Sequence, residues 1–172
     1  MKLLPLLLLS FFSLQVYAQH DHDISPTSGF EVTGSVKRSL KLSVNDLAAF
    51  RHDSLGDLII KNKRGEQKGI ARQLKGILLK TILDSAEIMA DKPKDYSELI
   101  VTLVASDGYK NVYSWNELYN TEVGNHVYII TEMDSKPVSE IQDRILVISL
   151  FDFNSGRRHL KALEKIEIKK VL

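Results

Sequence analysis

Residues 99–118, LIVTLVASDGYKNVYSWNEL, constrain the fold of this chain more than any other stretch. Residues 99–105 are apolar or β-branched and carry no charge, which indicates a strand that is covered on both faces and central in its sheet. Asp107 and Gly108 then supply the positive φ of a short hairpin turn. The return strand is expected to end at Ser114. Since Ser114 and Glu117 have the spacing of a capping box, a short helix is predicted directly after the hairpin.

The remaining patterns predict further strands and two more helices. Ser43 is expected to cap a short helix that ends near Phe50, and residues 79–86 have the apolar spacing of an amphipathic helix. The chain shows no strand–helix alternation and no glycine-rich phosphate loop, which argues against a dinucleotide-binding fold. We therefore expect an α+β fold with mostly antiparallel or mixed strands and about three short helices. The eight or nine strands are expected at residues 30–36, 40–42, 55–62, 67–74, 99–105, 109–114, 126–131, 145–151 and 157–168.

The N-terminal 18 residues have the pattern of a cleavable secretory signal. Lys2 precedes an apolar run, and small residues end at Ala18, where we expect cleavage. The apolar run is shorter than the roughly 20 residues of a membrane span, and no later segment is long enough. We therefore predict an exported protein, periplasmic or secreted and soluble after cleavage. It would have a flexible tail at residues 19–29 and one domain at residues 30–172.

Charge and cysteine content argue against several classes of protein. The chain has 23 Lys and Arg residues and 22 Asp and Glu residues, so its net charge creates no long-range field that favours nucleic acid or an anionic membrane. It has no cysteine, which excludes disulfides, thiolate nucleophiles and thiolate metal ligands. His20 and His22 in the tail are the candidates for a loose metal site, and a solvated spacer is the alternative.

Several segments, taken in order, resemble the oxidoreductase molybdopterin-binding domain, which is the fold of sulfite oxidase and its shorter bacterial relatives. Residues 74–86, LKGILLKTILDSA, are similar to a helix of this family, and residues 106–109, SDGY, are similar to one of its turns. The resemblance extends over nearly the whole chain from Phe30. It also includes residues 30–50, 127–138, 144–147 and 158–161. It implies the fold of an oxidoreductase cofactor-binding domain.

One departure separates this chain from the catalytic members of the family. The resemblance implies a cysteine thiolate that binds molybdenum directly, on the loop after the strand at residues 58–61. This chain has KNKRG at residues 61–65 instead. An ammonium or amide group cannot replace a soft thiolate as a ligand of this metal. Molybdopterin therefore remains a cofactor implied by the resemblance, whereas molybdenum chemistry of the sulfite oxidase type is not expected.

The resemblance also implies that an Arg and a Lys near the C-terminal end hold the pterin and its phosphate. In this chain these residues are Arg158 and Lys161, with Arg157 and His159 beside them. If this segment is a strand, Arg157, His159 and Lys161 share one face, while Arg158 and Leu160 take the other. Only part of the basic cluster can then face one pocket. A solvated edge, on which the long basic side chains cover apolar surface, is the alternative.

A second basic concentration extends from Lys61 to Lys80 and includes Lys63 and Arg64. Arg presents a planar fork that suits phosphate or carboxylate, so this run could form an anion-binding face. A solvated surface is again the alternative. At the central hairpin, Asp107 is expected to start the turn and Tyr109 to pack against the neighbouring sheet.

These observations lead to three hypotheses. The first is an exported, non-catalytic binding domain of the molybdopterin-binding fold. It would be a monomer and would bind a small anionic ligand or an envelope protein in the region of the cofactor site. The alternative is a periplasmic oxidoreductase component that binds a pterin cofactor through Arg158 and Lys161. The third is an envelope protein-interaction module whose exposed strand edges bind another protein.

Overall fold

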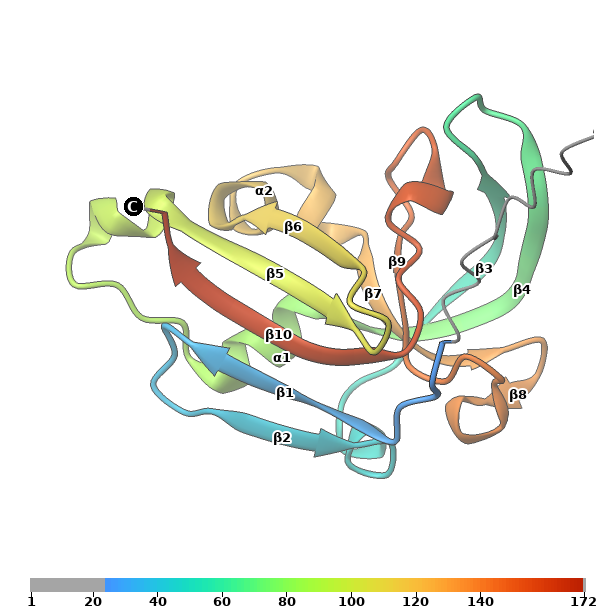
Figure 1. Ribbon diagram of the computed structural model, residues 1–172, viewed down its shortest axis with the longest axis horizontal. Coiled ribbons are helices and arrows are strands. Elements are labelled where there is room, and N and C mark those ends of the chain that lie inside the picture. Colours follow the sequence, from blue (N-terminus) through green and yellow to red (C-terminus); the bar gives the residue numbers. More distant parts are fainter. Residues whose placement is uncertain (1–23, 172) are drawn as a thin grey trace, which may run out of the picture.

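The computed structural model describes residues 24–171, which form two β-sheets with short helices between and beside them (Figure 1). This part of the chain is α+β, as predicted. Its strands are β1 (Gly29–Gly34), β2 (Leu40–Ser43), β3 (Asp53–Lys61), β4 (Gln67–Leu78), β5 (Leu99–Ala105), β6 (Lys110–Ser114), β7 (Val127–Met133), β8 (Lys136–Pro137), β9 (Leu146–Ser149) and β10 (Leu163–Lys170). Its helices are α1 (Leu79–Ala86) and α2 (Trp115–Tyr119), with 3-10 helices η1 (Asp46–Ala49), η2 (Pro93–Glu98), η3 (Glu122–Asn125), η4 (Val138–Glu140) and η5 (Ser155–Arg157).

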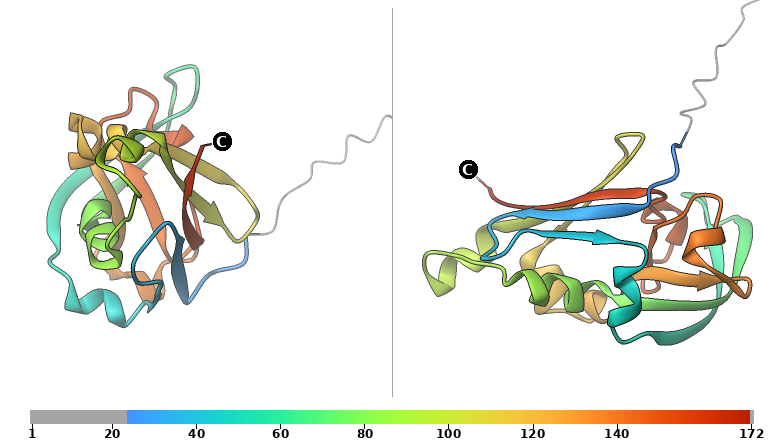
Figure 2. Two further views of the ribbon diagram at one scale, coloured as in Figure 1. Left: turned by 90° about the vertical axis from the view of Figure 1, so that its left-hand side faces the viewer. Right: turned by 90° about the horizontal axis from the view of Figure 1, so that it is seen from below.

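The first sheet has the strand order β2-β1-β10-β5-β6 and is mixed, because β1 and β10 are parallel while the other pairs are antiparallel. The second sheet has the order β3-β4-β7-β8, with β9 also paired to β7, and its pairs are all antiparallel. In the right-hand view of Figure 2 the first sheet forms the upper layer and α1 lies below it. The fold class expected from the sequence is confirmed.

The central strand of the first sheet is β10, not β5. On β5 one face is buried and the other is half-buried, and this strand is separated from the sheet edge only by β6. In β10, Ile166 and Ile168 are fully buried, while Glu164 and Lys169 are exposed. The charged outer face explains why β10 does not have the continuous apolar sequence expected of a strand covered on both sides.

The hydrophobic core receives side chains from both sheets and from α1. The four apolar residues of α1 (Leu79, Ile82, Leu83 and Ala86) are all fully buried, as their spacing predicted. The helix follows β4 without a connecting loop and ends at Glu87, which has a left-handed φ of 55°. The Glu87 carboxylate accepts hydrogen bonds from Lys37 and Arg38, so this helix end is tied to the connection between β1 and β2.

The hairpin and the capped helix after it form as predicted. Gly108 has a φ of +82°, and Asp107 Oδ1 accepts a hydrogen bond from the Tyr109 N–H at 2.8 Å. Ser114 Oγ accepts the Glu117 N–H at 3.0 Å at the start of α2. The first predicted helix is the 3-10 turn η1, which begins after Asn45 without a side-chain cap, so the predicted cap at Ser43 was wrong. Instead, Asp46 accepts hydrogen bonds from the N–H and hydroxyl of Ser43.

Two local expectations were wrong. Residues 157–162 are not part of a strand, because the segment begins in η5 and β10 starts only at Leu163. Tyr109 does not pack into a sheet, since it is 43% exposed and its hydroxyl donates to the Arg157 carbonyl at 2.7 Å. Within residues 24–171 no helix is long and apolar enough to cross a membrane. The predicted signal at residues 1–18, and His20 and His22, lie outside the described residues.

Replacing Ile82 by Ala tests the core of α1. The substitution leaves a cavity between the helix and the sheets, so the free energy of unfolding should fall by about 2–5 kcal/mol. Thr81→Ala, on the half-buried side of the same helix, is the matched control and should change it by less than about 0.5 kcal/mol. Urea denaturation followed by circular dichroism measures both, and equal losses would contradict the packing described here.

Candidate anion-binding site

The two basic segments of the sequence meet where η5 packs against the end of β3. The link is the hydroxyl of Ser155, which is almost fully buried. It accepts the Lys61 N–H at 3.2 Å and donates to the Ile59 carbonyl at 3.0 Å. These backbone groups lie on the edge of β3 opposite β4, which is the one strand paired with β3 within residues 24–171. The hydroxyl therefore occupies positions that the next strand of a sheet would otherwise fill.

Gly156 allows the two segments to approach this closely. A Cβ atom at this position would lie 2.6 Å from the carbonyl oxygen of Lys61, which is backbone and cannot move aside easily. A side chain here would therefore push η5 away from β3. Together, Ser155 and Gly156 hold the residues that follow them against the base of the β3–β4 hairpin.

The junction forms a cavity of about 570 Å³, which we call the basic pocket. Its lining includes six Lys, Arg or His side chains and, among the described residues, no carboxylate. A smaller cavity of about 320 Å³ shares Arg157, His159 and Lys161 with it and extends to Asp107 and Tyr109. The six basic or imidazole side chains of the basic pocket are Lys61, Lys63, Lys68, Arg157, His159 and Lys161.

The cations of the basic pocket are only partly neutralised within the protein. Lys161 Nζ lies 2.6 Å from Asp143, and Lys68 Nζ lies 3.4 Å from Glu66. In the part of the chain that the structure describes, Lys61, Lys63 and Arg157 form no ion pair. Like charges held close together repel, so an anion bound among them would relieve that repulsion.

His159 supplies an uncharged polar group to the same wall. Burial lowers the pKa of its imidazole, and the nearby charge of Lys161 lowers it further, while Asp143 acts in the opposite direction. The ring is therefore neutral at neutral pH. Its Nε2 atom is buried and has no hydrogen-bond partner among residues 24–171. A buried polar atom without a partner costs free energy in the folded protein.

Arg158 lies away from the basic pocket, although it is adjacent in sequence to two of its residues. Its guanidinium contacts Glu117 at 2.7 Å and Asp152 at 3.5 Å, and lies 4.4 Å from the centre of the Tyr113 ring. Tyr113 is fully buried, and burial raises the pKa of its hydroxyl. Arg158 therefore ties the site segment to α2 and β6, and its charge is balanced by two carboxylates.

Of the residues predicted to bind a ligand, the structure brings Lys63, Arg157, His159 and Lys161 together. Arg64 lies near the exposed tip of the β3–β4 hairpin and does not line the cavity. Sequence reasoning missed Ser155 and Gly156, because the run Asn-Ser-Gly indicates only a turn. No sequence pattern reveals that this serine binds a backbone edge 94 residues away.

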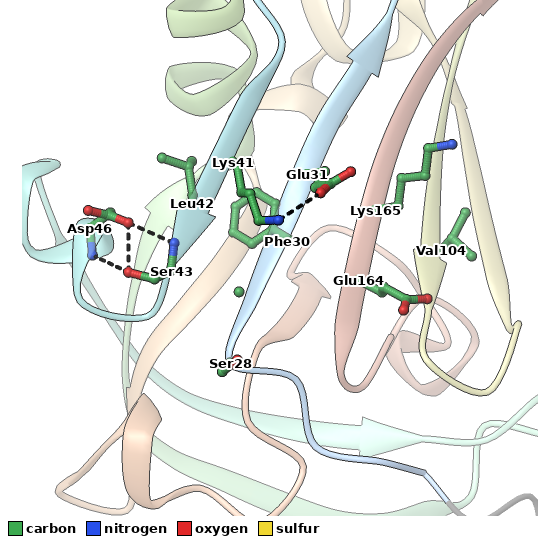
Figure 3. Close-up of a pocket in the computed structure, with 11 residues that line it drawn as sticks. Ser28, Phe30, Glu31, Lys41, Leu42, Ser43, Asp46, Val104, Glu164 and Lys165 are labelled. Carbon is green, nitrogen blue, oxygen red and sulfur yellow. Dashed lines mark hydrogen bonds and ion pairs between the residues drawn. The ribbon is translucent and has the colours of Figure 1, made fainter.

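A larger cavity, of about 620 Å³, lies over β1, β2 and β10 (Figure 3). Its polar side chains largely satisfy one another: Lys41 pairs with Glu31 at 3.4 Å, and Ser43 binds Asp46. Acidic and basic groups are mixed along its walls, so it has no preference for one charge. The basic pocket is the stronger candidate for a binding site, since its charge has a single sign.

Molybdenum ligation does not fit this site. The loop that follows β3 offers ammonium, amide and guanidinium groups and one carboxylate, Glu66, which already binds Asn62 and Lys68, and the chain contains no thiol anywhere. Within residues 24–171 there is also no cluster of three His, Cys, Asp or Glu side chains that could hold a metal ion. The donors that are present instead suit an anion, because ammonium and guanidinium groups only donate hydrogen bonds.

Comparisons with known proteins identify the fold alone. No family model matches the chain, and no curated protein sequence matches it. Among solved structures, the chain is similar to the sulfane dehydrogenase SoxCD from Paracoccus pantotrophus, with a TM-score of 0.58 and 12% sequence identity. The similarity covers 83% of this chain but only 39% of the dehydrogenase chain. It is consistent with the fold implied by the sequence resemblance.

Replacing Arg158 by Ala tests its role as a link between the site segment and α2. The change leaves Glu117 and Asp152 without their shared cation and uncovers the Tyr113 ring. The free energy of unfolding should fall by about 1–3 kcal/mol. Arg157→Ala is the matched control, and its exposed side chain should cost less than about 0.5 kcal/mol. Chemical denaturation of the two variants measures the difference, and the reverse order would refute the assignment.

The half-buried His159 should make stability depend on pH. Its pKa is lower in the folded than in the unfolded protein, so the unfolded chain takes up a proton first as the pH falls below about 6.5. The free energy of unfolding should therefore decrease between pH 7.5 and 5.5. His159→Gln should remove this part of the decrease, whereas the exposed-site variant Lys94→Gln should not. Urea titrations at the two pH values would contradict the prediction if wild type and His159→Gln changed equally.

Proposed function

We propose that this chain is an exported, non-catalytic binding domain that holds a small anionic molecule in the basic pocket. The observation that carries the proposal is the convergence of two distant basic segments around one cavity without a lining carboxylate. The net charge of this chain is near zero, so its overall composition does not account for a local cluster of cations. Such a cluster favours a binding role over a solvated surface.

The chemistry of the lining supports a ligand with phosphate, sulfate or carboxylate groups. Arg157 offers a planar guanidinium for two parallel hydrogen bonds, and the lysines offer point charges. His159 adds a neutral imidazole to the wall of the cavity. A cavity of about 570 Å³ is of the size that holds a small molecule.

Binding without redox catalysis is proposed because of the donor set. The catalytic relatives implied by the resemblance need a soft thiolate, and this chain has none to offer. The activity of the structurally similar dehydrogenase is not carried over, because similarity at 12% identity concerns the fold and 39% of that chain. Ligand recognition by charge is what the residues of this site support.

Thermal unfolding with inorganic phosphate, pyrophosphate or sulfate tests the proposal. At a concentration one hundred times Kd, a ligand adds about 2.7 kcal/mol of stability. For a domain of this size, the midpoint should rise by about 5–10 °C. The double variant Arg157→Ala/Lys161→Ala should lose most of this shift, because it removes two cations from the wall.

The control for that experiment is Lys92→Ala/Lys94→Ala, which removes the same charge near η2, away from the basic pocket. It should keep the full ligand-induced shift. If none of the three anions raises the midpoint, or if the pocket variant keeps the whole shift, the proposed site is refuted. Stoichiometric molybdenum in protein purified from its own host would refute the non-catalytic part of the proposal.

A further inference from the structure

The loop between β9 and η5 exposes two phenylalanine side chains. Phe153 is 96% exposed and Phe151 is 55% exposed, which makes Phe153 the most exposed large apolar side chain within residues 24–171. A single exposed apolar residue is common on protein surfaces, but two large rings on one loop are typical of an interaction site. What surrounds the loop decides what it can bind.

The loop that carries these rings is fixed at both ends. At its start, the Phe151 ring stacks on His126 with 5.1 Å between ring centroids, and Ser149 donates a hydrogen bond to Asp152. At its end, the buried Ser155 holds β3. Phe153 is therefore presented to solvent by an anchored loop. The exposure of Phe153 therefore does not result from a loop without contacts to the rest of the protein.

The tip of the β3–β4 hairpin lies beside this loop and is cationic. Both project on the same side of the molecule (Figures 1 and 2). A Cβ added to Gly65 at the tip would lie 3.9 Å from Oδ1 of Asn154, which follows Phe153. Lys63 and Arg64 at this tip are exposed, and within the described part of the chain neither forms an ion pair. We call Lys63, Arg64, Phe151 and Phe153 together the projecting surface.

We propose that the projecting surface docks on an anionic lipid membrane, with Phe153 inserted among the headgroups and Lys63 and Arg64 placed over lipid phosphates. Charge complementarity selects an anionic partner. The projecting surface consists of two protruding loops. A lipid bilayer is broad and deformable and can contact both loop tips at once, whereas a protein partner would need a surface of complementary shape. An exposed phenylalanine gains free energy when its apolar ring is buried at the boundary of headgroups and acyl chains, and nearby Lys and Arg add electrostatic attraction. The near-zero net charge of the chain does not oppose this, because the attraction acts within a Debye length.

Binding should be weak and reversible. Each Lys or Arg near an anionic surface strengthens binding by about fivefold, and insertion of one phenylalanine by about tenfold or more. The projecting surface shares Lys63 with the basic pocket, whereas Arg64, Phe151 and Phe153 do not line that pocket, so variants of Phe153 test the membrane proposal separately from the proposed function. Phe153→Ser should therefore leave the phosphate-induced thermal shift unchanged.

Co-sedimentation of the full chain, after removal of its predicted signal, with lipid vesicles tests the proposal. The protein should sediment with vesicles of equal phosphatidylglycerol and phosphatidylcholine at 0.05 M salt, on the order of tenfold more than with phosphatidylcholine alone. At 1 M salt, where the Debye length is about 3 Å, this preference should disappear. Phe153→Ser should weaken the partition coefficient about tenfold, and Phe153→Trp should restore it.

Matched variants separate the projecting surface from general charge and hydrophobicity. Lys63→Glu/Arg64→Glu should reduce binding at least about twentyfold, because each of the two lost cations strengthens binding by about fivefold. Lys92→Glu/Lys94→Glu, with the same change in net charge, and Val112→Ser, which removes another exposed apolar side chain, should change binding less than about twofold. Absence of binding to the anionic vesicles overturns the proposal and leaves a protein as the occupant of the surface. Equal losses in the test and control variants overturn it too.

Discussion

The contact between the Ser155 hydroxyl and the edge of β3 is the interaction on which the candidate site depends. It satisfies one N–H and one carbonyl of a strand that has no neighbour on that side, and it does so with a side chain that is itself buried. An exposed edge invites pairing with other chains, so this contact also protects the strand. With Gly156 allowing the close approach, the same contact brings two cationic segments within reach of one ligand.

The site segment is coupled to the core by the residues between its cations. Leu160 forms a backbone bridge with Val147 of β9 and is fully buried, and Ala162 is buried next to the start of β10. Arg158 points the other way and pairs with Glu117, a residue of α2 whose N–H donates to the Ser114 cap. One wall of the basic pocket is therefore anchored to the core at Leu160 and to α2 at Arg158.

The similarity to part of a sulfane dehydrogenase concerns the fold, and the chain itself contains no thiol that could bind a soft metal. A fold hosts many functions, and the functional residues decide among them. The proposals made for this chain rest on cations around a cavity and on two exposed rings beside a cationic hairpin tip, and it is the cations that favour an anionic partner.

The sequence by itself determined the elements whose signals are local. The buried face of α1, the Gly108 turn and the Ser114 cap depend on residues within one or two helical turns, so spacing and side-chain chemistry were enough to predict them. Residues 157–161 show an intermediate case. Arg157, His159 and Lys161 line one cavity while Arg158 and Leu160 do not, as alternation implies, although the segment is not a strand. Only the tertiary structure decided that β10 is central, that Arg158 is neutralised, and that the hairpin meets η5. Those outcomes depend on pairings between residues far apart in the chain. The free energy of such contacts comes from burial of apolar side chains and from hydrogen bonds to backbone groups on strand edges, which no local sequence pattern encodes.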